Sequence, residues 1–170
     1  MRMLFIEADG VLMDRVDLNR PEELLKEGYY AMRVPEWRMI GAVNRVIRVL
    51  PQTEVYVVLH VPLALEQAKA ELAEWYGRYF PCAEALRFLP VEEYFGSYIA
   101  LRKGDVLLSA DIRTIAVFTL WGGTCIGVDI DKDAIPGITS VSSRDGVEPV
   151  ADRILDTIIG REVRAWRILP

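Results

Sequence analysis

Two acidic residues follow a short apolar run near the N-terminus and are the first candidates for chemistry. Glu7 and Asp9 come directly after residues 3–6 and are separated by one residue, with Gly10 next. Two carboxylates at the end of one strand can serve as a nucleophile or metal ligand and as a general acid or base. The same residues can instead form a strand-end turn, because Asp-Gly favours turns. Both interpretations stay open on the sequence.

Other polar residues are expected at the ends of later strands. His60 closes the apolar run 54–60, where an imidazole can hold a metal, bind a phosphate as imidazolium, or hydrogen-bond within the core. Asp111 follows the run 105–109, and it either joins a metal site or caps a helix that begins at Ile112. Each of the two residues therefore has a structural alternative beside its chemical one.

The elements that must position these residues alternate along the chain. The pattern predicts strands over residues 3–6, 54–60, 86–89, 105–109 and 124–128, and helices over 21–28, 35–50, 63–79, 112–121 and 147–159. Residues 129–143 are rich in Asp, Pro, Gly and Ser and are predicted as a loop. Alternating strands and helices indicate an α/β fold, a three-layer, doubly wound parallel sheet whose ligands bind beyond the carboxyl ends of the strands.

Composition narrows the classes of function. A chain of 170 residues suits one domain over 1–170, and 52% apolar residues exclude wholesale disorder. The net charge of −5 disfavours nucleic acid as a partner, and two cysteines with one histidine argue against structural zinc. The sequence has no apolar run long enough for a membrane span, and acidic residues come too early for a signal peptide, so we expect a cytoplasmic protein.

Residues 4–12 resemble the opening motif of the haloacid dehalogenase (HAD) superfamily, an apolar strand followed by Asp-x-Asp-Gly-x-Leu. Further segments resemble the small 5′-nucleotidase-like members of that superfamily. These segments are 28–30 with Pro35, 39–43, 54–58, 75–81, 105–108 and 122–124. The resemblance covers residues 3 to 130 and implies a HAD-like fold with a small cap or flap over residues 13–34.

The resemblance also implies a reaction. In such enzymes an Asp attacks a phosphate, and the Asp two residues later acts as general acid and base. A Ser or Thr and a Lys hold the phosphate, and acidic residues after the fourth strand bind Mg²⁺. In this chain Glu7 occupies the place of the nucleophile and Asp9 that of the general acid and base.

The remaining motif positions depart from the superfamily pattern. Leu59 stands where the Ser or Thr is expected, with His60 beside it, and Phe95 stands where the Lys is expected. Ser109 and Ala110 replace the acidic pair, and Asp111 comes one place late. The phosphate and metal contacts that the resemblance implies are therefore largely missing from the sequence.

We predict a HAD-like, 5′-nucleotidase-related protein that has lost phosphatase activity, needs no cofactor, and binds a nucleotide-like or phosphate ligand or a protein partner. One alternative is an active phosphohydrolase on a nucleoside monophosphate or similar small phosphoester. Its acids are then Glu7 and Asp9, and Glu7, Asp9 and Asp111 hold Mg²⁺. The other alternative is a structural or oligomer-forming protein whose cleft is filled by Leu59 and Phe95.

Three aromatic residues lie in or beside the predicted cap. Tyr29, Tyr30 and Trp37 have rings that can stack on a nucleobase. The same rings can instead seal the cap onto the body of the domain. Their exposure in the folded chain decides between these two interpretations.

Overall fold

The computed structural model describes residues 3–15, 22–61, 66–81, 85–90 and 104–166. Within them, six strands form one sheet in the order β3-β2-β1-β4-β5-β6, and every neighbouring pair is parallel. The strands are β1 (Met3–Glu7), β2 (Glu54–Val61), β3 (Ala85–Pro90), β4 (Val106–Ser109), β5 (Thr124–Val128) and β6 (Thr139–Val141). The predicted doubly wound α/β architecture is thereby confirmed.

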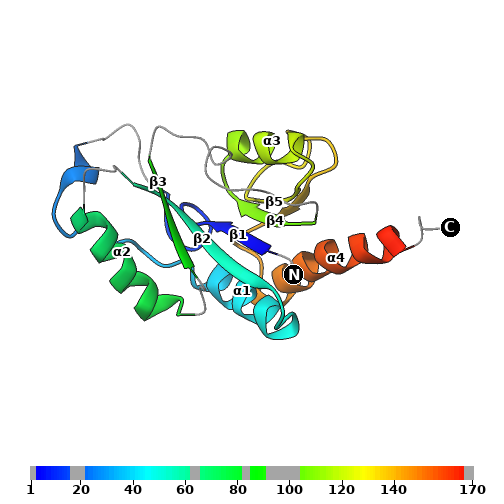
Figure 1. Ribbon diagram of the computed structural model, residues 1–170, viewed down its shortest axis with the longest axis horizontal. Helices are drawn as coiled ribbons and strands as arrows, with labels where there is room; N and C mark the ends of the chain where they lie inside the picture. Colours follow the sequence, from blue (N-terminus) through cyan, green and yellow to red (C-terminus); the bar gives the residue numbers. More distant parts are fainter. Residues whose placement is uncertain (1–2, 16–21, 62–65, 82–84, 91–103, 167–170) are drawn as a thin grey trace.

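Helices cover both faces of this sheet. They are α1 (Trp37–Val49), α2 (Glu66–Tyr79), α3 (Ile112–Leu120) and α4 (Val147–Trp166). Figure 1 shows α1, α2 and α4 on one face and α3 on the other. Because side chains alternate along a strand, Leu4 and Ile6 pack into the core under α1 and α2, whereas Phe5 packs into the core under α3.

Two predicted elements differ from the structure, and one was missed. The helix predicted over 21–28 is wrong, because only a 3-10 turn, η1 (Glu23–Leu25), forms there. A run this short lacks the length to offset helix nucleation by itself. The loop predicted over 129–143 contains β6, whose three residues give too short an alternation to identify. Helix α4 continues through Gly160 to Trp166 instead of ending at residue 159.

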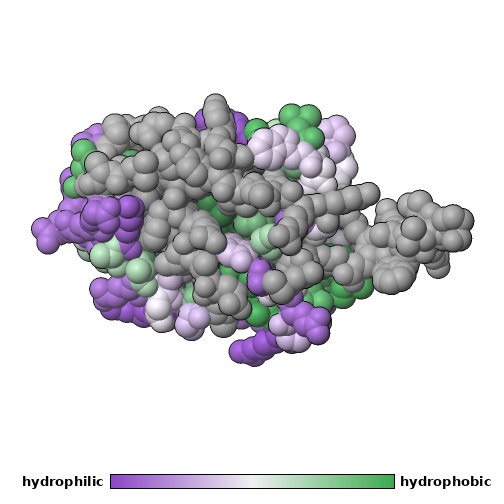
Figure 2. Space-filling view, in the orientation of Figure 1, coloured by the Kyte–Doolittle hydropathy of each residue, from purple (hydrophilic) through white to green (hydrophobic). Residues whose placement is uncertain are grey.

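The outer face of α3 carries exposed apolar side chains. Ile112 and Leu120 lie on the helix and Trp121 follows it, and all three are exposed. Figure 2 shows apolar atoms at the surface over this helix. The predicted oligomer or protein partner stays a prediction.

No helix in the described segments is both long enough and apolar enough to span a membrane.

The parallel register gathers the carboxyl ends of all six strands at one edge. Glu7 ends β1, Ser109 ends β4, and Asp129 follows β5. Strands β1 and β4 are direct neighbours, with Ile6 opposite Leu108. The polar residues picked out from the sequence near residues 7–9 and 109–111 are therefore brought together at this edge.

Candidate functional site

Glu7 is buried at the end of β1, with 3% of its surface exposed. The Ser109 hydroxyl donates a hydrogen bond to its Oε2 atom. The Thr114 hydroxyl lies 3.4 Å from Oε1. Both carboxylate oxygens thus face hydroxyl groups of β4 and α3, so the side chain links the sheet to the helix that covers it.

Asp111 caps the N-terminus of α3. Its Oδ1 atom accepts the Arg113 backbone N–H at 3.2 Å, and its Oδ2 atom accepts the Thr114 hydroxyl at 3.0 Å. Burial raises the pKa of Asp111, but these hydrogen bonds and the charge of Arg113 outweigh it and hold the pKa below its ordinary value. Of the two roles open to Asp111 on the sequence, the structure shows the helix cap.

Asp9 forms an ion pair that the sequence analysis did not anticipate. Arg33 Nη2 lies 3.0 Å from Asp9 Oδ1, and Arg33 Nε lies 2.9 Å from Asp14 Oδ1. Only 3% of the Arg33 side chain is exposed. Burial disfavours the charged guanidinium, but Asp9 and Asp14 more than compensate and raise the pKa of Arg33. The two carboxylates therefore keep a buried cation charged.

The segment that carries Arg33 is fixed to α2. Glu71 of α2 accepts the backbone N–H groups of Gly28 at 2.8 Å, Tyr30 at 3.1 Å and Ala31 at 3.4 Å. The Trp75 indole donates to the Arg33 carbonyl at 2.8 Å. These bonds span the second half of the predicted cap, and they hold the guanidinium of Arg33 against Asp9.

A second cation lies across the ends of β1 and β4. Arg15 Nη2 donates to the Ala110 carbonyl at 2.5 Å. Gly10 has a φ of +75°, and a Cβ atom built there would lie 2.8 Å from Arg15 Cγ and 2.9 Å from Ala110 Cβ. The absence of a side chain at Gly10 thus lets Arg15 cross to the end of β4.

The donor atoms at this edge do not fit the Mg²⁺ that the resemblance implies. Glu7 accepts from hydroxyls, Asp9 from a guanidinium, and Asp111 from the first turn of α3. In the described segments, no three His, Cys, Asp or Glu side chains form a metal-binding group. Mg²⁺ requires several oxygens in octahedral order, and several oxygens of these three carboxylates already accept hydrogen bonds within the chain.

For three further predicted site residues, the side chains are not described by the structure. Leu59 and His60 belong to β2, where their backbones pair with Phe88 and Leu89 of β3. Their side chains fall outside the described part of the structure, as does the whole of Phe95. The predictions for these three positions stay predictions.

The three aromatic residues differ sharply in exposure. Tyr30 is 3% exposed, and burial together with the Asp9 charge raises its pKa to about 12. Tyr29 packs edge-on against Tyr30, with ring centroids 5.1 Å apart. Trp37, in contrast, is 60% exposed and contacts Tyr79 edge-on at 5.4 Å. The geometry favours Trp37 over Tyr30 for stacking on a ligand.

Comparison with known proteins yields a match in fold. No protein-family model matches the sequence, and no curated protein matches it. The crystal structure of a D,D-heptose 1,7-bisphosphate phosphatase from Burkholderia thailandensis is similar, with a TM-score of 0.60 and 11% sequence identity. The match covers 91% of this chain and 99% of that chain. It shows that the chain shares the Rossmann-type parallel α/β fold of that phosphatase, which agrees with the fold class predicted from the sequence.

Proposed function

We propose that this chain is a HAD-like protein without phosphatase activity, which acts by binding a ligand or partner. The observation that carries the proposal is the ion pair between Asp9 and the buried Arg33. The resemblance assigns Asp9 the role of general acid and base. Asp9 also pairs with a cation whose side chain has little exposed surface.

The ion pair opposes acid catalysis. A general acid must hold a proton until the leaving group departs. The Arg33 guanidinium donates a hydrogen bond to Asp9 Oδ1 at 3.0 Å, so this oxygen is engaged within the chain and not with a leaving group. Arg33 is held in place by Asp14 and Trp75, so moving it away would break several hydrogen bonds.

Glu7 is equally ill suited to attack a phosphate. Its side chain is one methylene longer than Asp, and a misplacement of about 1 Å at a reacting atom lowers a rate roughly 100-fold. Its carboxylate also accepts the Ser109 hydroxyl, and this hydrogen bond stabilises the charge and lowers the nucleophilicity of that oxygen. A structural role accounts for both the burial and the hydrogen bonds of Glu7.

The test is phosphate release from nucleoside 5′-monophosphates, p-nitrophenyl phosphate and a sugar bisphosphate, with Mg²⁺ or Mn²⁺ added. The Asp9→Asn variant, purified in parallel, measures the contaminating activity. We expect the same rate from both preparations. Turnover by the wild-type chain that disappears in the Asp9→Asn variant would overturn the proposal.

An active phosphohydrolase is the second candidate, favoured by one observation. The similar structure is that of a phosphatase, and Glu7 and Asp9 lie at the carboxyl end of β1 where ligands of such sheets bind. The same assay separates the two candidates. Only an active enzyme loses turnover when Asp9 is replaced.

A further inference from the structure

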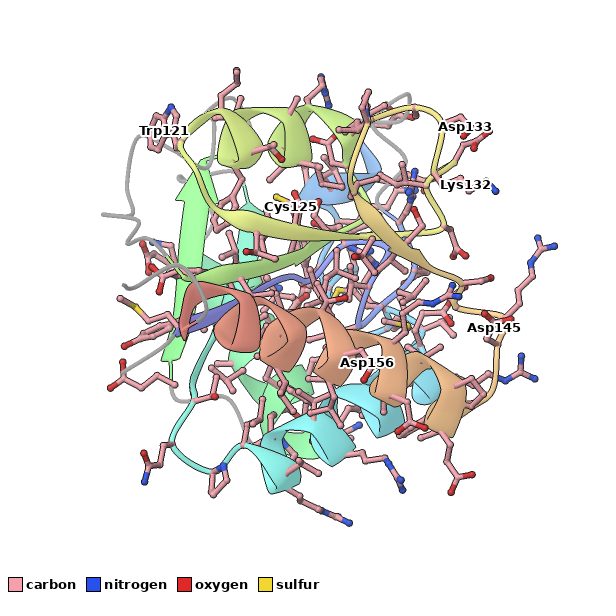
Figure 3. The ribbon with its side chains drawn as sticks, turned by 90° about the vertical axis from the view of Figure 1, so that its right-hand side faces the viewer. Trp121, Cys125, Lys132, Asp133, Asp145 and Asp156 are labelled. Atoms are coloured by element: carbon pink, nitrogen blue, oxygen red, sulfur yellow. The ribbon has the colours of Figure 1, made fainter. Side chains whose placement is uncertain are left out.

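A second pocket lies at the same sheet edge, beyond the ends of β5 and β6. It has a volume of about 1010 Å³ and is lined by residues 34–38, 129–132 and 140–145 together with Arg153. None of the carboxylates assigned to phosphoryl transfer contributes to its lining. Figure 3 shows Lys132, on the loop after β5, and Asp145, on the loop before α4, on the same side of the molecule.

The walls of this pocket are bonded to one another. Asp129 has a φ of +53°, and its carboxylate accepts the Ser142 hydroxyl at 3.0 Å and the Ser143 N–H at 3.0 Å. These bonds join the end of β5 to the end of β6. Arg38 of α1 donates to the Arg144 carbonyl at 2.7 Å, which ties the helix to the same loop. These hydrogen bonds hold the walls of the pocket together.

Four cations line this pocket. They are Arg38, Lys132, Arg144 and Arg153, and within the described residues none of them forms a salt bridge. Elsewhere the same part of the chain pairs Lys26, Arg33, Arg45, Lys69, Arg78 and Arg113 with carboxylates. Arg144 interacts electrostatically with the Asp129 carboxylate. Cations gathered at one pocket are suited to an anion.

Acidic residues also line the pocket, namely Glu36, Asp129, Asp131 and Asp145. Two of them are engaged by their own loops. Asp129 accepts hydrogen bonds from two serines, and Asp131 accepts the Asp133 N–H at 3.0 Å. The carboxylates of Asp129 and Asp131 thus shape the loops, whereas the guanidinium and ammonium groups retain unused donors.

An aromatic ring borders the same space. Trp37 lines the pocket with 60% of its surface exposed, and the Tyr79 ring packs against it at 5.4 Å. Trp37 also begins α1, whose first turn has no side-chain cap. The uncapped N–H groups and the helix dipole add positive potential at this end of a pocket whose lining carries four cations and four carboxylates.

We propose that this pocket binds a small anion that carries a flat ring, of the class of a nucleoside monophosphate. Arg144 and Lys132 hold the phosphate, because guanidinium and ammonium groups donate charge-assisted hydrogen bonds to its oxygens. Trp37 stacks on the ring, a contact that every base can make. This inference does not rest on the proposed loss of phosphatase activity, because the two sites share no residue.

The first experiment is calorimetric titration of the full chain, in EDTA, with each of the four common nucleoside 5′-monophosphates. We expect at least one to bind with a Kd below about 1 mM. The matching nucleoside, which lacks the phosphate, and inorganic phosphate, which lacks the ring, should each bind at least about tenfold more weakly. Failure of all four nucleotides to bind overturns the proposal.

Variants then locate the bound nucleotide. Replacing both cations, Lys132→Gln with Arg144→Gln, should weaken binding at least about tenfold, and so should Trp37→Leu. Matched controls outside the pocket are the exposed residues Arg48 and Trp121, as Arg48→Gln and Trp121→Leu. These should leave the Kd within about twofold of wild type. Circular dichroism melts verify that each variant is folded.

The opposite pattern places the ligand elsewhere. If Asp9→Asn abolishes nucleotide binding while the double variant at Lys132 and Arg144 retains it, the nucleotide occupies the carboxylate site and the proposal is wrong. Equal losses in the pocket variants and in the controls would likewise contradict it, because they would reflect only a change in overall charge or fold.

Discussion

The two polar sites at the carboxyl edge of the sheet differ in the burial and the ion pairing of their charged side chains. At the ends of β1 and β4, Arg33 is buried and bonded to Asp9 and Asp14. At the ends of β5 and β6, Lys132 and Arg144 line an open pocket and form no salt bridge within the described residues. A buried charge without a partner is very unfavourable, whereas an exposed charge is solvated by water. The buried cation of the first site is therefore bound by carboxylates of the same chain, whereas the exposed cations of the second site can contact a ligand.

The largest predicted effect is at Arg33. Arg33→Met should lower the free energy of unfolding by about 3 kcal/mol, because it leaves Asp9 and Asp14 without their buried cation. The matched control is Arg45→Met, since Arg45 pairs with Glu148 and Asp152 at the exposed surface. That variant should lose less than about 0.5 kcal/mol. Urea unfolding followed by circular dichroism measures both, and equal losses would contradict the contrast between the sites.

A second prediction compares two serines that each donate to a carboxylate. Ser109→Ala should destabilise the fold by about 2 kcal/mol, because it removes the buried donor to Glu7. Ser142→Ala removes an exposed donor to Asp129 and should lower stability by about 0.5 kcal/mol or less. A double-mutant cycle with Glu7→Gln should show coupling to Ser109. A purely catalytic Glu7 would show no such coupling, and its replacement would raise stability.

The third prediction concerns alkaline stability near the closed site. Because the pKa of Tyr30 is raised to about 12 in the folded chain, its neutral phenol contributes stability below the ordinary tyrosine pKa. That contribution is lost as the pH rises towards 12. Tyr30→Phe should therefore flatten the alkaline limb of a plot of Tm against pH. An unchanged alkaline limb would show that the phenol ionises equally well in the folded and unfolded chain.

The smallest effect is expected for Asp129, at the open site. Burial raises its pKa, but hydrogen bonds from Ser143 and Ser142 outweigh burial and lower the pKa below its ordinary value. A carboxyl with a lowered folded pKa stabilises the fold above its ordinary pKa, and this stability is lost as the pH falls. Asp129→Asn should slightly reduce the Tm at neutral pH and weaken its fall in acid. Asn also tolerates the positive φ of this position, so the backbone should be undisturbed.

Much of the fold was predictable because apolar runs and helical stripes are local signals. The strand over residues 124–128 and the buried stripe of α1 follow directly from such patterns. Short elements such as η1 and β6 could not be predicted from the sequence, because three residues carry too little periodicity. Their positions depend on partners distant in sequence, such as β5 for β6.

The candidate site was predictable only where its residues are close in sequence. Glu7 and Asp9 are two positions apart in a strand-end motif, and Asp111 directly precedes a helix. The contact of Arg33 with Asp9 spans 24 residues and depends on Glu71 and Trp75, which hold the intervening segment. The pocket at β5 and β6 draws its lining from separate segments, so no linear pattern marks it.

Hydrogen–deuterium exchange with and without a bound nucleoside monophosphate tests the contrast between the two sites most directly. We expect slower exchange in residues 37–40 and 129–145, which border the open pocket, and no change in residues 7–14 and 109–114. Protection confined to residues 7–14 and 109–114, or no protection at saturating nucleotide, would contradict nucleotide binding at the open pocket.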